Sequence, residues 1–186
     1  MKEIYKPVLI FIDNLRRDYL VAEVIKVFLE KKNFKVFLVS RENLNQSLKF
    51  IKPDLVVFIK NYFQEISKNI LNEINEEADI VFIDAEGSQT LDRCKFFTER
   101  YKINVLEQTR RARKIFLWNS EVKDYLQNYT KENKEKFFVS GSPKINLSLL
   151  AKDLIKIPNQ KSIGFIGRFT AINTFDGRSC LENSSK

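Results

Sequence analysis

Four short polar segments of this sequence hold the residues best suited to chemistry, and each follows an apolar run. They are residues 13–18, 84–88, 119–120 and 141–144. In open α/β sheets, ligands bind at the carboxyl ends of parallel strands, near the point where the strand order reverses. If the apolar runs are parallel strands, the four segments lie at one edge of one sheet. We therefore treat them together as the candidate site.

The first segment places acidic and basic groups in the first turn of an expected helix. Backbone N–H groups at a helix start attract anions, and the guanidinium of Arg17 can hold a phosphate or a carboxylate through two parallel hydrogen bonds. An ordinary helix cap, with Asp13 as the N-cap and Asp18 in the first turn, explains the same residues. Position alone leaves both interpretations open.

The second segment offers carboxylates at a strand end. Asp84 and Glu86 stand beside Gly87, directly after an apolar run. A carboxylate in this place can accept the proton of an attacking hydroxyl as a general base. The alternative is a turn closed by an Asx-type hydrogen bond. Both interpretations are kept.

The other two segments contribute an aromatic ring and a cation. Trp118 ends an apolar run and can stack on a sugar ring, with packing in the core as the alternative. Residues 141–144 read Gly-Ser-Pro-Lys, which combines a tight turn with a helix start, because proline is favoured at the first helical position. Lys144 at that start can bind phosphate, and a solvated surface lysine is the alternative.

Composition removes several classes of site. The chain has no histidine, which excludes histidine triads, histidine metal ligands and histidine bases. Cys94 and Cys180 form neither a CxxC metal pattern nor a disulfide framework, and a reducing compartment suits them. No glycine-rich dinucleotide fingerprint and no P-loop is present. We therefore expect no bound metal and no resident cofactor.

The chain is basic, with a net charge of +8. A lysine-rich surface accounts for this charge, as does an anionic partner such as a nucleotide sugar, a lipid phosphate or the anionic face of a membrane. Because no recognised nucleic-acid motif is present, we expect no nucleic-acid partner. No apolar run approaches the ~20 residues of a membrane helix, and no signal peptide is recognisable. We expect a cytoplasmic protein, with peripheral contact at the inner membrane face as an option.

Short apolar runs alternate with amphipathic segments along the chain. Continuous apolar runs are typical of parallel strands covered on both faces, and they predict strands at 7–12, 34–39, 54–59, 78–83, 114–118 and 137–140. Apolar residues at helical spacing predict the connecting helices, of which residues 90–112 are the least regular. With right-handed crossovers this alternation predicts an α/β, doubly wound, Rossmann-like parallel sheet. We expect the strand order 3-2-1-4-5-6.

The same alternation predicts one domain over residues 1–158. The chain has 186 residues, of which 44% are hydrophobic, and this is enough to bury one core. Ile157 and Pro158 interrupt the pattern, and a new strand is expected at 162–169. We interpret residues 159–186 as a linker and the first strand of an incomplete second domain. The alternative is that this strand joins the first sheet.

Several of these segments, in this order, resemble a known family. They are Arg17-Asp18, Asp84-Ala85-Glu86-Gly87, Phe116-Leu117-Trp118, Val139-Ser140-Gly141-Ser142-Pro143-Lys144-Ile145-Asn146-Leu147 and Ile163-Gly164-Phe165-Ile166-Gly167-Arg168-Phe169. Their order and spacing over residues 8–175 are similar to those of the surface carbohydrate (surface polysaccharide) biosynthesis protein family. The sequence departs from the family pattern at Asn119, Ser142 and Lys144, where Gly, Asn and Arg are usual. Lys144 therefore lacks the bidentate geometry of arginine.

The resemblance implies a glycosyltransferase of the GT-B type, in which two Rossmann-like domains face each other across a cleft. This chain would then be the N-terminal, acceptor-side domain, followed by a truncated start of the domain that holds the nucleotide sugar. The implied reaction transfers a sugar from a nucleotide-sugar donor to a glycan or a lipid-linked acceptor, without a bound metal. A front half alone should be inactive, because the cleft needs both walls to position the donor and exclude water.

Within this resemblance we predict roles for individual residues. Glu86 and Asp18 are the candidates for the catalytic base, and the predicted substrate-binding residues are Asp13, Arg17, Asp84, Trp118, Ser142 and Lys144. Two other classes of function stay open. One is a non-catalytic Rossmann-like binding or regulatory module that pairs with another chain. The other, less favoured, is a nucleic-acid-binding domain, which the net charge and the arginine-rich residues 100–113 suggest.

Overall fold

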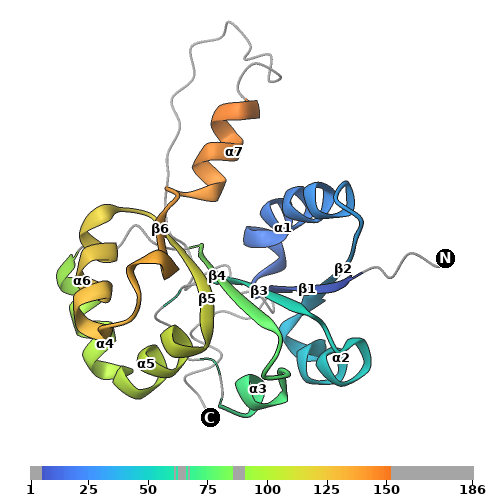
Figure 1. The fold of residues 1–186 in the computed structure, drawn as a ribbon. Helices are drawn as coiled ribbons and strands as arrows, with labels where there is room; N and C mark the ends of the chain where they lie inside the picture. Colours follow the sequence, from blue (N-terminus) through green and yellow to red (C-terminus); the bar gives the residue numbers. More distant parts are fainter. Residues whose placement is uncertain (1–5, 61, 63–65, 67, 86–90, 152–186) are drawn as a thin grey trace, which may run out of the picture. The chain divides into compact units, whose positions relative to one another are not determined.

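A parallel sheet forms the centre of the domain. The computed structural model describes residues 6–60, 62, 66, 68–85 and 91–151, and every structural statement below concerns these residues. Their strands are β1 (Lys6–Ile12), β2 (Phe34–Ser40), β3 (Leu55–Lys60), β4 (Asp79–Asp84), β5 (Ala112–Leu117) and β6 (Phe137–Val139). All neighbouring strands run parallel, in the order β2-β1-β3-β4-β5-β6 (Figure 1). The predicted α/β class with a parallel sheet is confirmed.

Helices cover both faces of this sheet. They are α1 (Leu15–Glu30), α2 (Leu44–Ile51), α3 (Lys68–Glu73), α4 (Leu91–Arg100), α5 (Lys102–Arg111), α6 (Ser120–Thr130) and α7 (Pro143–Ala151), with short 3-10 helices at Arg41–Asn43 and Lys134–Lys136. α1 and α7 cover one face, and α2 to α6 cover the other (Figure 1). The buried apolar side chains of these helices pack in two separate clusters, one on each face. The described sheet is therefore doubly wound, as predicted, but its two faces are covered unequally.

The strand order differs from the expected 3-2-1-4-5-6. β3 lies between β1 and β4, and β2 takes the edge of the sheet. Burial explains the difference. Residues 56–60 of β3 are all buried, whereas β2 carries an exposed Lys35 and buries only Val36 and Val39. A strand that is buried on both faces belongs in the centre of a sheet, so β3 is central and β2 is peripheral.

The observed order reverses between β1 and β3, which fixes where the ligand-binding crevice of the sheet lies. The chain leaves β1 through α1 to reach β2, then returns through α2 to β3 on the other side of β1. The register aligns Ile12 with Ile59 and Lys60 with Asp84. The carboxyl ends of β1, β3 and β4 therefore meet at one edge.

Most predicted strands lie within two residues of their expected places. The described part of the irregular segment, residues 91–111, forms two helices, α4 and α5, joined at Tyr101. Asp84 is the last residue of β4 and not the first residue of a loop. The predicted strand at 162–169 and the predicted domain boundary at 158 lie outside the described residues.

A row of aromatic rings crosses the central strands. Phe11, Phe58 and Phe82 stand on β1, β3 and β4, with ring centroids 5.5 Å and 5.2 Å apart. Tyr62 meets Phe82 edge-on at 5.5 Å. Burial of each such ring contributes about 1.5–3 kcal/mol, and edge-on or offset ring contacts add to it. The row ties together the three strands whose ends form the candidate site.

Phe58→Ala should lower the free energy of unfolding by about 3–5 kcal/mol, because it leaves a cavity at a side chain with no exposed surface. Phe50→Ala is the control, since the Phe50 side chain on α2 is 79% exposed, and it should change the value by less than about 0.5 kcal/mol. Urea unfolding followed by circular dichroism measures both. Equal losses in the two variants would contradict the central position of the aromatic row.

Candidate functional site

The carboxylate of Asp18 lies at the centre of the candidate site and has no exposed surface. The local sequence fixes it. Asn14 is the N-cap of α1, and its side chain accepts the N–H of Arg17 at 3.2 Å. Asp18 Oδ2 in turn accepts the N–H of Asn14 at 3.2 Å, so the two side chains satisfy the first donors of the helix reciprocally. A carboxylate here also faces the positive end of the helix dipole.

Two cations neutralise Asp18. Arg17 Nε donates to Oδ1 at 2.9 Å and Arg17 Nη2 donates to Oδ2 at 2.9 Å, which makes a bidentate pair. Lys144 Nζ, from α7, lies 3.2 Å from Oδ1. Burial acts to lower the pKa of Arg17, but the hydrogen bonds and charges of Asp18 and Asp13 together raise it above its ordinary value. The pairs hold the first turn of α1 against the first turn of α7, because an unneutralised buried carboxylate would cost several kcal/mol.

The turn before α7 delivers Lys144 to this place. Gly141 has a φ of +69°, a left-handed conformation that favours glycine. The hydroxyl of Ser142 caps α7, because it accepts a hydrogen bond from the N–H of Ile145 at 3.3 Å. Pro143 opens α7, where a missing N–H breaks no helical hydrogen bond. Lys144 Nζ also donates to the carbonyl of Ala85 at 3.3 Å, which ties α7 to the end of β4.

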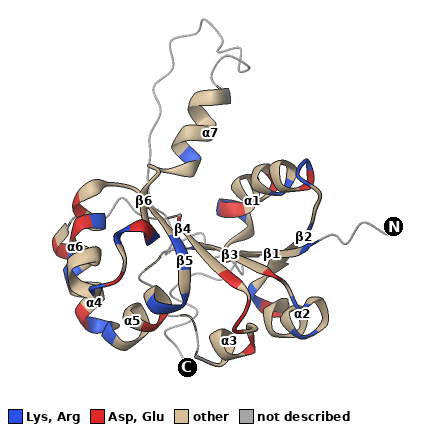
Figure 2. Cartoon of the chain, viewed as in Figure 1, with Lys and Arg blue, Asp and Glu red and all other residues tan. Residues whose placement is uncertain are grey.

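Asp13 adds a second carboxylate directly after β1. It accepts a hydrogen bond from Arg17 Nη2 at 3.4 Å and pairs with Arg41, which follows β2. We call Asp13, Arg17, Asp18, Arg41 and Lys144 the charged cluster. Figure 2 shows charged positions at the starts of α1 and α7, on the same face of the sheet.

The charged cluster places its acids inside and its bases outside. The side chains of Asp18 and Asp13 are 0% and 10% exposed, whereas those of Arg17 and Lys144 are 28% and 30% exposed. Arg41 is the most exposed of the five. An approaching molecule therefore meets guanidinium and ammonium groups first, and the surface of the cluster attracts anions.

Asp84 ends β4 beside the charged cluster and is buried. Burial raises the pKa of its carboxyl to about 7, while the N–H of Tyr62, 3.4 Å from Oδ1, and the charge of Lys144 act to lower it. Asp84 therefore changes protonation near neutral pH, which is the property that a general base needs. Its backbone carbonyl accepts the indole N–H of Trp118 at 2.7 Å, so the tryptophan is fixed against the same strand end.

Sequence reasoning misses Lys60 and Arg41. Lys60 is buried at the end of β3, in register with Asp84. Parallel strands lie about 4.8 Å apart and aligned residues point to the same face, so these two side chains are neighbours. The position of Lys60 at the end of an otherwise apolar run is the sequence signal that could have indicated this residue. No local pattern marks Arg41, which reaches Asp13 only because β2 pairs with β1.

The predicted site residues that the structure describes all lie at the carboxyl edge of the sheet. They are Asp13, Arg17, Asp18, Asp84, Trp118, Ser142 and Lys144. Ser142 positions Lys144 through its cap, and Asp18 has the burial and the partners of a positioning residue. Substrate contact by Ser142 and proton transfer by Asp18 stay predictions. Glu86, the other predicted base, lies outside the described residues.

The described residues form neither a metal-binding cluster nor a membrane-spanning helix. Among them, no group of three or more acidic or cysteine side chains is arranged to hold a metal ion. None of the helices they form combines the length and the hydropathy of a membrane span. Burial raises the pKa of Cys94 to about 11, which keeps this thiol protonated and unreactive.

No protein-family model, curated protein or solved structure matches this chain. The class of the molecule therefore rests on its own geometry. It is an α/β domain with a doubly wound parallel sheet and an ion-paired, outwardly cationic cluster at the carboxyl edge of that sheet. Because a fold of this kind hosts many functions, the function has to be argued from the site.

The raised pKa of Asp84 predicts that this residue makes the free energy of unfolding fall as pH rises. An unfolded aspartate loses its proton near pH 3.9, whereas folded Asp84 keeps its proton up to about pH 7. Between these values the folded state binds more protons than the unfolded state. Asp84 therefore destabilises the protein progressively as pH rises, by at most about 1.4 kcal/mol per pH unit, and the effect levels off above pH 7.

Asp84→Asn should remove this contribution. The free energies of unfolding of the wild type and the variant are compared at pH 5 and pH 7.5, and the variant should gain stability relative to the wild type as pH rises. Other titrating groups are common to both proteins and cancel in the comparison. A constant difference, with the variant less stable at both pH values, would show that Asp84 is ionised throughout and stabilised by Lys60 and Lys144.

Proposed function

We propose that this domain is the acceptor-side half of a glycosyltransferase-like protein of surface polysaccharide synthesis, and that its charged cluster binds a phosphate-bearing substrate. The observation that supports this proposal is the ion pair of Lys144 Nζ with Asp18 Oδ1 at 3.2 Å. It joins two of the segments that resemble surface carbohydrate biosynthesis proteins. These segments are far apart in the sequence, and they meet where open α/β sheets bind their ligands.

The charged cluster suits a phosphate group for electrostatic reasons. Asp18 holds Arg17 and Lys144 in fixed positions, so little reorganisation is needed when an anion arrives. The cations are the exposed members of the cluster, and the carboxylates lie behind them. Nucleotide sugars and lipid-linked sugars both carry phosphate groups that such a surface attracts.

In the proposed reaction an acceptor hydroxyl attacks the anomeric carbon of the donor sugar. A bond forms between the acceptor oxygen and that carbon, the bond from the carbon to the donor phosphate breaks, and the nucleoside diphosphate leaves. The transition state carries oxocarbenium-like charge, as in glycoside cleavage. A carboxylate takes the hydroxyl proton. Asp84, with its pKa of about 7, is the described carboxyl best tuned to do so, and Glu86 and Asp18 are the candidates from the sequence.

A non-catalytic binding module is the second candidate function. The observation that favours it is the extensive internal pairing of Asp18, which accepts from Arg17 and Asn14 and lies against Lys144. A buried ion pair of this kind can serve the architecture alone. This alternative has no sugar transfer, and the module would act by pairing with another chain.

The arginine-rich residues give little support to nucleic-acid binding. Arg111 Nη2 donates to the carbonyl of Ile74 at 3.2 Å, and Arg113 pairs with Asp79 at 3.4 Å. Arg100 lies over the ring of Tyr101. These guanidiniums are engaged with different neighbours inside the domain, so they do not form the single basic stripe that a phosphate backbone requires.

The proposal predicts that sugar 1-phosphates, as probes of a phosphate-bearing acceptor, bind the 186-residue chain. Arg17→Gln should weaken this binding by about tenfold or more, because a hydrogen bond to a charged group contributes about 1.5–3 kcal/mol. Arg113→Gln is the matched control, since Arg113 belongs to the opposite, amino end of β5. Isothermal titration calorimetry measures both. Equal weakening in the two variants, or equal affinity for the same sugar without phosphate, would refute the proposal.

A further inference from the structure

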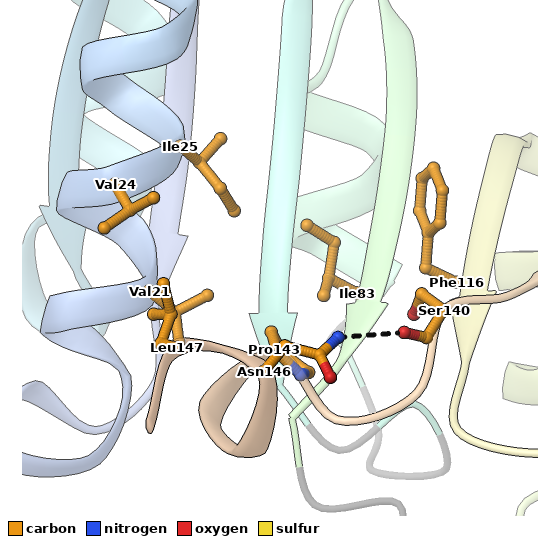
Figure 3. Close-up of a pocket in the computed structure, with 9 residues that line it drawn as sticks. All are labelled: Val21, Val24, Ile25, Ile83, Phe116, Ser140, Pro143, Asn146 and Leu147. Atoms are coloured by element: carbon orange, nitrogen blue, oxygen red, sulfur yellow. Dashed lines mark hydrogen bonds between the residues drawn. The ribbon is translucent and has the colours of Figure 1, made fainter. Parts of the chain in front are cut away.

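An open apolar pocket of about 280 Å³ lies on the α1 side of the sheet. Its walls come from α1, from the ends of β4 and β5, from Ser140 and from the start of α7. The lining residues are Val21, Val24, Ile25, Ile83, Phe116, Ser140, Pro143, Asn146 and Leu147 (Figure 3). The amide of Asn146 donates to the carbonyl of Ser140 at 3.2 Å, so this polar group at the rim is already bonded. The interior suits hydrocarbon better than a sugar ring.

The pocket lies where, among the described helices, only α1 and α7 cover this face of the sheet. α1 packs over β1, β2 and β3, and α7 adds Leu147 beside the buried residues of this face. Ile83 of β4 and Phe116 of β5 are therefore only partly buried. On the opposite face the same strands bury Phe82 and Ile115 completely or almost completely. Within the described residues, the apolar surface between α1 and α7 is therefore open.

The elements that line the pocket also carry the charged cluster. On α1, Val21 follows Asp18 by one helical turn. On α7, Leu147 follows Lys144 by one turn. On β4, Ile83 lies two residues before Ala85, whose carbonyl accepts a hydrogen bond from Lys144. One end of the apolar pocket is therefore bounded by groups whose exposed members are cations, which is complementary to a molecule with an apolar chain and an anionic head.

We propose that this pocket binds the first carbons of a lipid phosphate, with the hydrocarbon between α1 and α7 and the phosphate at Arg17 and Lys144. The phosphate head rests on the function proposed above, whereas the hydrocarbon rests on the pocket itself. An apolar cavity of about 150 Å³ already holds benzene, and drug-sized ligands occupy about 300–1,000 Å³. The pocket therefore takes a short stretch of alkyl chain, and each methylene removed from water strengthens binding by about fourfold.

Calorimetric titration of the 186-residue chain with octyl phosphate, octanol and inorganic phosphate tests the proposal. Octyl phosphate should bind at least about tenfold more tightly than either of the other two, because it alone uses both the pocket and the cations. Val24→Phe, which fills the pocket, should weaken octyl phosphate binding by about tenfold or more and leave inorganic phosphate binding unchanged. Val27→Phe is the matched control, since Val27 is an exposed residue of the same helix outside the pocket lining.

Octyl phosphate that binds no better than inorganic phosphate, or that binds both variants equally, would overturn the proposal. The pocket would then be an apolar surface against which another protein segment packs. If Val24→Phe does not fold, nuclear Overhauser effects in the wild type decide the question. They should join the octyl chain to the methyl groups of Ile83 and Leu147, which line the pocket, and effects confined to other methyl groups would overturn the proposal.

The two proposals fail in different ways. Sugar phosphates that bind through Arg17, with octyl phosphate no tighter than inorganic phosphate, would remove the lipid pocket and leave the proposed function standing. Octyl phosphate that binds in the pocket, while no sugar phosphate binds, would remove the proposed function and leave the pocket.

Discussion

A carboxylate removed completely from water has to be neutralised, and this requirement decides how the candidate site of the domain is built. Asp18 is placed by the cap of α1, and its charge draws in Arg17 from the same helix and Lys144 from α7. Lys144 also holds the carbonyl of Ala85, after β4. The buried charge of Asp18 thus connects the start of α1, the start of α7 and, through Lys144, the end of β4. In these ion pairs Arg17 and Lys144 lie outside Asp18. The same interactions that join the helices therefore leave a cationic surface at the carboxyl edge of the sheet, which attracts anions.

The strand order determines which loops share this edge. With β3 beside β1, the order reverses between these two strands, and the loop carrying Asp13 and the buried end of β3 at Lys60 come together. The same topology leaves α1 and α7 as the described helices on one face. That face is the thinner one, and the apolar pocket forms there, next to the charged cluster. The polar and apolar features of the site therefore have a common origin in the winding of the chain.

Much of this architecture follows from the sequence because its signals are local. Apolar runs indicate buried strands, the Asp13–Asn14 pair indicates a helix start, and Gly141 with Pro143 indicates the turn into α7. What does not follow depends on which strands are neighbours. The position of β3 beside β1 was predicted wrongly, and it is decided by the greater burial of β3 relative to β2. Lys60 meets Asp84 only because β3 lies beside β4, although the lysine at the end of an apolar run is a local signal. Arg41 reaches Asp13 through the pairing of β2 with β1, and no pattern around Arg41 marks that contact.

The architecture of the site depends on the contact of Asp18 with Lys144, and a double-mutant cycle measures the energy of that contact. The free energy of unfolding is measured for the wild type, Asp18→Asn, Lys144→Met and the double variant. Because Lys144 is 30% exposed, solvent weakens the pair, and we predict a coupling energy of about 1 kcal/mol. Losses that simply add in the double variant would show that the two side chains do not interact, and would contradict the role of Asp18 in joining α1 to α7.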